Sequence, residues 1–252
     1  MKKLFSKMAF LSDLPIEKKE ALHNLLKPTE KEIEKYSNIE YFYNSYIEEV
    51  LNVSQKNVRS NYNINIRVKY DRDKNKVFSE GLYSYRLYPS DSGYTDILVG
   101  FLKDDNESSV DIILNMPNGH REEFLFEKIK DRFENSETNK SAKIEVNNIC
   151  KDFRHIDVEL RVREYGSDHW MNVFFKAEQA TDGFKMIIEA EDDLSIKSKA
   201  VVFDTGANYR VEPISGREEK EVHISCFQWL SEGSGVSLIV SKPESTPIEK
   251  EC

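Results

Sequence analysis

The chain has 252 residues and a mass of 29.4 kDa, which suits one large domain or two small ones. Its formal net charge of -9 would repel the backbone of a nucleic acid unless a local basic stripe intervened, so a nucleic-acid partner is not expected. Aromatic residues make up 11% of the chain, enough large apolar surface for it to fold rather than stay disordered. No segment approaches the roughly 18 apolar residues of a membrane-spanning helix, and we expect no membrane partner.

The cysteines indicate the compartment. Only Cys150, Cys226 and Cys252 occur, an odd number at wide spacing. Secreted disulfide frameworks have an even number of cysteines at short spacings. We therefore expect a soluble protein of the reducing cytoplasm.

The first part of the chain reads as helical. One helix is expected near 13–27, after which Lys27-Pro28 stops it. Thr29 and Glu32 then form a capping-box pattern, which predicts a short helix near 30–36. A longer helix is expected near 38–53, because apolar residues recur there at steps of three and four.

From Tyr62 the hydrophobic period changes to two. Tyr62, Ile64, Ile66, Val68 and Tyr70 alternate with polar residues, which predicts a strand with one face on a core. Further strands are expected near 77–88, with Gly81 as a bulge, and near 94–102 and 110–116. Residues 121–134 return to helical spacing, with Phe126, Ile129 and Phe133 on one side.

Residues 134–141 contain no large apolar side chain and read as a linker. Beyond them no helix is expected, and turn signals recur about every ten residues, as in an antiparallel sandwich or barrel. Strands are predicted near 142–150, 154–165, 169–177, 184–190, 194–203, 208–212, 220–230 and 236–241.

The predicted fold is therefore an α+β domain followed by an all-β domain. Residues 1–134 form a helical segment and a four-stranded antiparallel sheet, and residues 142–241 form the all-β sandwich or barrel. Residues 242–252, with two prolines and a charged end, are expected to be a flexible tail.

The motifs of several enzyme classes are absent from the sequence. It has no phosphate-binding glycine loop, no G-x-S-x-G elbow, no paired cysteines and no H-E-x-x-H helix. We therefore predict no cofactor and no metal. The lack of motifs favours a non-catalytic protein, but active sites assembled from distant strands leave no local spacing, so an enzyme stays open.

Two alternative sites remain. Asp168 and His169 lie at a predicted corner and form the most economical acid/base pair, which would suit a hydrolase or lyase with a site between the two domains. Acidic turns around 71–73, 91–96, 104–107 and 191–193 could hold calcium at the rim of a sandwich, although none has the spacing of an EF-hand.

Aromatic residues suggest a binding surface. The 169–177 strand is apolar on both faces, with Trp170 and Phe174 on one and Met171, Val173 and Phe175 on the other. It is either covered on both sides or presents an outer apolar patch that contacts a partner. Trp229, the second of the two tryptophans, is a further candidate for binding.

These observations favour a non-catalytic protein-interaction module of the adaptor, inhibitor, immunity or assembly-component kind. Its acidic surface would suit a basic protein partner. The alternatives are a hydrolase or lyase that uses Asp168 and His169, and a calcium-dependent binding module.

Overall fold

The computed structural model describes residues 27–36, 57–102, 107–136, 139–203 and 208–243, together with single positions 15, 17, 18, 21, 24 and 39. Most of these residues are in β-strands. The strands are β1 (Val58–Asp71), β2 (Lys76–Tyr88), β3 (Ile97–Leu102), β4 (Ser109–Asn115), β5 (Arg121–Phe124), β6 (Glu134–Asn135), β7 (Asn139–Ile144), β8 (Ile156–Tyr165), β9 (Trp170–Lys176), β10 (Thr181–Ala190), β11 (Ser195–Val202), β12 (Tyr209–Pro213), β13 (Glu221–Leu230) and β14 (Gly235–Ser241).

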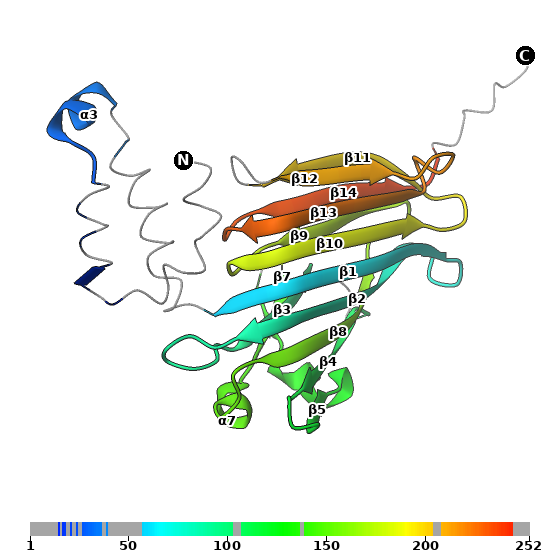
Figure 1. Cartoon of the computed structure of the whole chain (residues 1–252). Helices are drawn as coiled ribbons and strands as arrows, with labels where there is room; N and C mark the ends of the chain where they lie inside the picture. The colour runs from blue at the N-terminus through cyan, green and yellow to red at the C-terminus, as the bar shows by residue number, and fades with distance from the viewer. Residues whose placement is uncertain are drawn as a thin grey trace, which may run out of the picture. The chain divides into compact units, whose positions relative to one another are not determined.

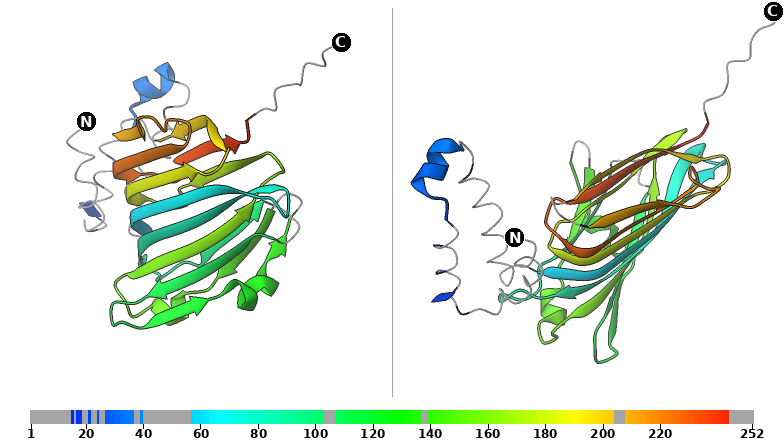
Figure 2. Two further views of the ribbon diagram at one scale, coloured as in Figure 1. Left: turned by 90° about the vertical axis from the view of Figure 1, so that its right-hand side faces the viewer. Right: turned by 45° about the horizontal axis from the view of Figure 1, so that its top comes forward.

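Eight of these strands form one large mixed sheet in the order β12-β13-β10-β1-β2-β8-β4-β5 (Figure 1). The strands β1 and β2 form a long antiparallel hairpin, while β1 and β10 pair in parallel, with Ile64 opposite Met186. The sheet twists progressively from β12 to β5 (Figure 2). The two central parallel strands, β1 and β10, are separated in the chain by the 109 residues 72–180.

Two three-stranded sheets, β11-β14-β9 and β3-β7-β6, complete the β structure of the described residues. The inward side chains of all three sheets belong to one buried hydrophobic cluster, so the small sheets cover one face of the large sheet. An aromatic group joins the layers: the Phe175 ring lies 5.2 Å from that of Tyr62 and stacks on that of Phe184 at 4.5 Å. These three sheets form a two-layer β-sandwich whose second layer is split.

The alternation predicted for the first strand is confirmed. Ile64, Ile66 and Val68 are almost completely buried, and the intervening polar residues face outward. The expected bulge at Gly81 is wrong, because Gly81 stays in register with Ile66. The irregularity lies instead on β1 between Ser60 and Asn63, where Asn61 has a positive φ of 51°.

The predicted fold class, an α+β domain followed by a separate all-β domain, is wrong. The β1–β2 hairpin and β4 come from the first part of the chain, yet they share the large sheet with β8, β10, β12 and β13. Residues 58–88 and 94–252 form one compact unit. The expected linker, 134–141, contains β6 and the start of β7. Alternation identifies a strand but not its partner, which explains the error.

Three α-helices are described, and each is short. The helix α3 (Glu30–Lys35) confirms the predicted capping box: the Glu32 carboxylate accepts hydrogen bonds from the Thr29 N–H at 2.9 Å and from the Thr29 hydroxyl at 2.8 Å. The segment predicted to be helical over 121–134 divides into β5, α6 (Phe126–Ile129) and the 3-10 turn η4 (Lys130–Arg132). The helix α7 (Asn147–Cys150) was not expected.

The inward residues of the 121–134 segment were nevertheless identified correctly, because Ile129 and Phe133 are buried and Phe126 packs against the same cluster. The expected helices near 13–27 and 38–53, and the tail beyond residue 243, lie outside the described residues apart from single positions. In the part of the chain that is described, no helix is long and apolar enough to cross a membrane.

Candidate functional site

The strand β9 presents two large aromatic side chains to solvent. Trp170 is 43% exposed and Phe174 is 58% exposed, whereas Met171, Val173 and Phe175 on the opposite face are buried. Among the described residues, the outer face of this strand is thus covered only in part. An exposed pair of large aromatic rings on one strand is typical of a contact surface.

Neighbouring strands extend this surface. On β14, Ile239 lies opposite Asn172 and is 38% exposed; on β11, Val202 is 68% exposed. Small residues lie between them: Ser237 is opposite Phe174 and also pairs with Ala200. The Ser237 hydroxyl donates a hydrogen bond to the Asn172 side-chain oxygen at 2.8 Å. We call this surface the β9 face; it consists of Trp170, Asn172, Phe174, Lys176, Ser198, Ala200, Val202, Ser237 and Ile239.

The sheet that carries the β9 face is locally basic. Its three strands contain Lys176, Lys197 and Lys199 and no aspartate or glutamate. The whole chain, in contrast, has a formal charge of -9. On the β9 face itself Lys176 is the one charged residue, and it lies 3.3 Å from Glu178. Lys199 is on the other side of the sheet, because it pairs with the buried Leu238, and its Nζ donates to the Glu218 carbonyl at 3.5 Å.

The second tryptophan lies in the other layer. Trp229 is half-buried on β13 of the large sheet, opposite Asp182 on β10. Phe227 on the same strand is 76% exposed, which the sequence analysis did not single out. Burial raises the pKa of the Asp182 carboxyl above its usual value. Trp229 is thus not part of the β9 face.

Asp168 and His169, the predicted acid/base pair, lie together in the turn between β8 and β9. The His169 Nδ1 atom is 2.5 Å from Asp168 Oδ1, and both side chains are about two-thirds exposed. The hydrogen bond to His169 lowers the pKa of the Asp168 carboxyl. The turn holds this pair at the surface, and neither of the two hollows described below includes it.

The other described histidines are scattered. His120 lies 3.7 Å from Glu122 at the β4–β5 turn, His223 lies 2.8 Å from Glu221 on β13, and the His155 ring packs against Tyr88. Each His–carboxylate pair thus stands at a different place on the surface. Within the described residues, the structure does not gather histidines into one site.

The outer face of the large sheet is covered by ion pairs. Glu80 on β2 binds Lys69 Nζ at 2.9 Å and Arg163 Nη2 at 2.6 Å. The hydrogen bond from Lys69 is the main reason why the pKa of Glu80 is lowered. On β10, Glu189 binds Arg217 at 2.7 Å. Because cations and carboxylates alternate across the strands, this face largely satisfies its own charges.

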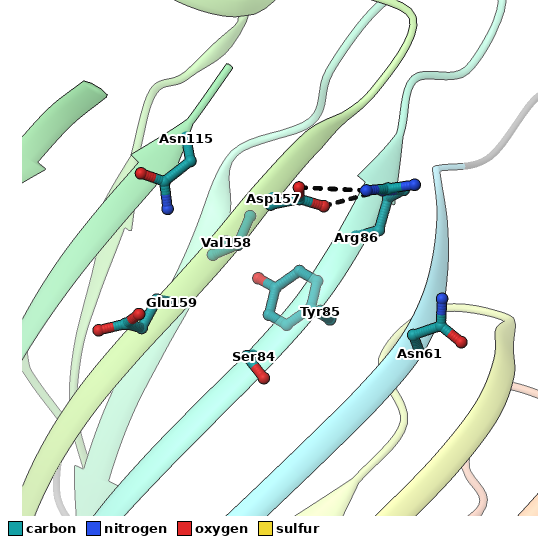
Figure 3. Close-up of a pocket in the computed structure, with 8 residues that line it drawn as sticks. All are labelled: Asn61, Ser84, Tyr85, Arg86, Asn115, Asp157, Val158 and Glu159. Atoms are coloured by element: carbon teal, nitrogen blue, oxygen red, sulfur yellow. Dashed lines mark hydrogen bonds and ion pairs between the residues drawn. The ribbon is translucent and has the colours of Figure 1, made fainter. Parts of the chain in front are cut away.

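A polar hollow of about 270 Å³ lies on this outer face (Figure 3). At its edge the Arg86 guanidinium forms a two-point contact with the Asp157 carboxylate, at 2.8 Å and 3.2 Å. The hollow is lined by Asn61, Ser84, Tyr85, Arg86, Asn115, Asp157, Val158 and Glu159. Arg86 is the only cation in this lining, and Asp157 neutralises it, so the hollow offers amides, hydroxyls and carboxylates.

A second, wider hollow of about 720 Å³ surrounds the Glu80–Arg163 pair. It is lined by Asn65, Ile66, Arg67, Glu80, Gly81, Leu82, Ser109, Asp111, Arg161, Val162, Arg163, Ile187 and Glu189. Most charged residues of this lining take part in the ion pairs of the sheet, as in Arg163–Glu80 and Arg67–Glu189.

The acidic turns considered for calcium serve the protein itself where they are described. The Asp71 carboxylate accepts hydrogen bonds from the N–H groups of Asp73 and Lys74 at 3.1 Å, and from the Tyr165 hydroxyl at 3.3 Å. Glu191 lies 4.0 Å from both Arg67 and Lys69. Across the described ranges, no group of three or more His, Cys, Asp or Glu residues could hold a metal ion. Residues 104–106 lie outside those ranges.

Comparison with known proteins adds no identification. No protein-family model matches the sequence, and no curated protein is significantly similar to it. A protein from Parabacteroides distasonis ATCC 8503, described as a candidate protease, superposes with a TM-score of 0.43 and 10% identity over 73% of this chain. This chain spans 40% of the length of that protein.

Two structures of the yeast delta-COP-I mu-homology domain also align. The domain alone and its complex with a Dsl1 WxWxV peptide each give a TM-score of 0.16, at 11% and 10% identity, over 75% of this chain and 76% of theirs. With all three TM-scores this low, no statement about the function of this chain follows from these likenesses.

Proposed function

We propose that this chain is a non-catalytic protein-binding module that contacts its partner through the β9 face. The observation that carries the proposal is the exposure of Trp170 and Phe174 on the same face of β9, while Met171, Val173 and Phe175 on its opposite face are buried. Exposed aromatic rings lose solvent contact when a partner docks, and tryptophan is among the residues that most often dominate interface energies. A role as an adaptor, inhibitor, immunity protein or assembly component fits this arrangement.

The expected basic partner needs revision at this surface. Lys176 is the one charged residue of the β9 face, so a partner that binds beside it gains from an acidic rather than a basic side chain. A basic partner would instead suit the acidic remainder of the surface. We keep a protein partner and place its acidic groups opposite the β9 face.

A cytoplasmic location is part of the same proposal. Cys150 is a free thiol, and it is buried in the hydrophobic core. Burial raises the pKa of the Cys150 thiol to about 11, which keeps it protonated and unreactive. Free buried thiols are compatible with a reducing compartment.

The proposal is tested by quantitative affinity capture from native lysate with matched variants. The double variant Trp170→Ser, Phe174→Ser removes both rings from the β9 face. Phe227→Ser, which removes a 76% exposed ring from the other layer, serves as the control. We expect one or more proteins to be recovered with the wild type and with the control but lost with the double variant.

A contradictory result would be recovery of the same proteins by all three forms, or recovery of the chain without any companion. Circular dichroism of each variant checks that the fold is retained. We expect retention, because both rings of the double variant lie outside the packed core.

A further inference from the structure

The strand β9 is an edge strand. In its sheet it pairs with β14 on one side, and no strand in the described part of the chain pairs with its other side. A free edge exposes a row of backbone N–H and C=O groups that can pair with another chain. The arrangement of these groups on β9 can be worked out from the hydrogen bonds at its two ends.

At one end the N–H of Ala177 donates to the Ser234 carbonyl at 2.7 Å, and at the other the N–H of Lys242 donates to the His169 carbonyl at 2.9 Å. Both bonds continue the β9–β14 register, in which bonded positions recur at every second residue. The backbone groups of the odd-numbered residues of β9 therefore point toward β14. Those of Asn172, Phe174 and Lys176 point toward the free edge.

Trp170 also has its backbone groups on the free side, but a turn already uses them. The Trp170 carbonyl accepts hydrogen bonds from the Ser167 N–H at 2.9 Å and from the Ser167 hydroxyl at 2.8 Å. The Trp170 N–H donates to the Ser167 hydroxyl oxygen at 3.1 Å. The available part of the edge thus begins after Trp170.

Most other sheet edges in the described residues are protected. The edge strand β5 has four residues, three of them charged, and β12 ends in Pro213 beside an Arg210–Glu212 pair. The edge strand β11 carries two lysines and a register shift, and β6 has only two residues. Charges, prolines, bulges and short length are the usual devices that prevent edge pairing.

Only β3 and β9 lack these devices. The strand β3 has the sequence ILVGFL. Among its described side chains, Leu98 is the one large hydrophobic side chain that is exposed. The strand β9 has a charge only at its last residue, Lys176, and carries Trp170 and Phe174 on its outer face. A strand added beside β9 would place alternate side chains next to these two rings and next to Lys176.

We infer that β9 is the docking edge for an extended acidic segment of a protein partner, which adds to the β11-β14-β9 sheet as a fourth strand. This inference rests on the proposed function and specifies the partner's chemistry. The partner's backbone forms hydrogen bonds with the backbone groups of Asn172, Phe174 and Lys176. Its β-branched or aromatic side chains pack beside Phe174 and Trp170. A carboxylate lies opposite Lys176.

Charge supports an acidic segment. The strand β9 has Lys176 as its one charged residue, while Lys197 and Lys199 lie on β11 at the opposite edge of the sheet. A basic side chain opposite Lys176 would meet a like charge, whereas a carboxylate there would be attracted. Lys176 contacts Glu178 at 3.3 Å, but both side chains are nearly half exposed. An exposed pair of this kind contributes little, and Lys176 can share its charge with the partner.

The test uses synthetic peptides as probes for the full chain. Two acetylated and amidated peptides alternate valine with threonine, and each carries two glutamates. The first peptide has both glutamates at its N-terminal end and the second has both at its C-terminal end, so that either strand direction can place a carboxylate opposite Lys176. A third replaces the glutamates by lysines. A fourth keeps every side chain but has N-methyl groups on alternate backbone nitrogens, which block strand pairing. Fluorescence anisotropy of labelled peptides measures affinity.

We expect one glutamate peptide to bind and the lysine and N-methylated peptides to bind at least about tenfold more weakly. Asn172→Pro removes a backbone donor on the free edge, whereas Asn172→Ala removes only the side chain and its bond to Ser237. The proline variant should weaken binding about tenfold and the alanine variant less than about twofold. Amide exchange measured by NMR should slow at Asn172, Phe174 and Lys176 when the peptide binds.

Three results would overturn the inference. The first is no binding of either glutamate peptide up to about 1 mM. The second is binding that N-methylation and Asn172→Pro leave unchanged, which would indicate docking on the face and not on the edge. The third is slow exchange at Asn172 and Phe174 without peptide, together with a dimer in sedimentation velocity, which would make a second copy the occupant. The lysate capture decides the proposed function separately, since it depends on the rings and not on the edge.

Discussion

The neighbouring residues Phe174 and Phe175 allow a sharp test of the strand orientation on which the candidate site depends. They have the same side chain, and their Cα atoms are adjacent in the chain, but they point to opposite faces of β9. Phe174 is 58% exposed and Phe175 is 4% exposed. We expect Phe175→Ala to destabilise the protein severely and Phe174→Ala to have a small effect.

The two costs can be estimated from the structure. Phe175 is in contact with the rings of Tyr62 and Phe184, and its removal leaves a cavity between the two layers. Loss of a buried phenylalanine ring of this kind costs about 3–5 kcal/mol. Phe174 leaves no cavity, and less than half of its surface is buried. A burial contribution of about 1.5–3 kcal/mol for a fully buried ring then scales to about 0.6–1.3 kcal/mol.

Urea unfolding followed by circular dichroism measures both values. With a slope of about 2–3 kcal/mol/M, Phe175→Ala should lower the midpoint by about 1–2.5 M, and Phe174→Ala by about 0.2–0.6 M. Equal destabilisation by the two variants would refute the orientation of β9 and show that the Phe174 side is covered. A cost below about 1 kcal/mol for Phe175→Ala would refute the packing between the layers.

Three further outcomes are expected. Gly235→Ala should lower the melting temperature, because the added Cβ would lie 2.8 Å from the Phe175 carbonyl oxygen. Gly119→Ala is the comparison, since Gly119 has a φ of 83° but open space around it. A larger loss of melting temperature in Gly119→Ala than in Gly235→Ala would contradict this account. Glu80→Gln should flatten the acid side of the stability curve. The pKa of Glu80 is lowered in the folded protein, so the ionised carboxylate stabilises the fold above its unfolded pKa, and this stabilisation disappears as the pH falls through the folded pKa. Urea titrations between about pH 3 and 6 measure the effect. The same dependence of stability on pH in Glu80→Gln and in the wild type would exclude it. Cys150 should resist alkylation by iodoacetamide at pH 8 in the native protein and react after unfolding, since burial raises the pKa of its thiol to about 11. Mass spectrometry of the Cys150 peptide after timed labelling measures the rate. Rapid labelling of the native protein would contradict the prediction.

Much of the secondary structure follows from the sequence. The alternation of Tyr62, Ile64, Ile66 and Val68 predicts both the strand β1 and its inward face, because side chains of a strand point to opposite sides in turn. The Thr29–Glu32 pattern predicts the start of α3 for an equally local reason. Residues 121–134 were misread as one helix, since a short strand followed by one helical turn can place Ile129 and Phe133 inside just as a continuous helix would.

The candidate site was recognised only in part. The sequence showed that the strand β9 is apolar on both faces, and so it pointed to Trp170 and Phe174. It could not show that Ile239 and Val202 lie on the same surface, because Val202 comes 26 residues and Ile239 63 residues after the last residue of β9. Nor could it separate Trp229 from this surface, since nothing local tells which sheet a strand joins.

The amino-acid sequence by itself determined where most of the longer strands lie, which of their side chains face inward and that the histidines have no common spacing. These properties depend on neighbours a few residues apart. Only the tertiary structure decided that β1 pairs in parallel with β10, that strands of both halves share one sheet, and that β9 has a free edge. Such pairings bring together segments far apart in the chain, and the backbone groups that form them are the same in every residue except proline, so no local pattern specifies the partner.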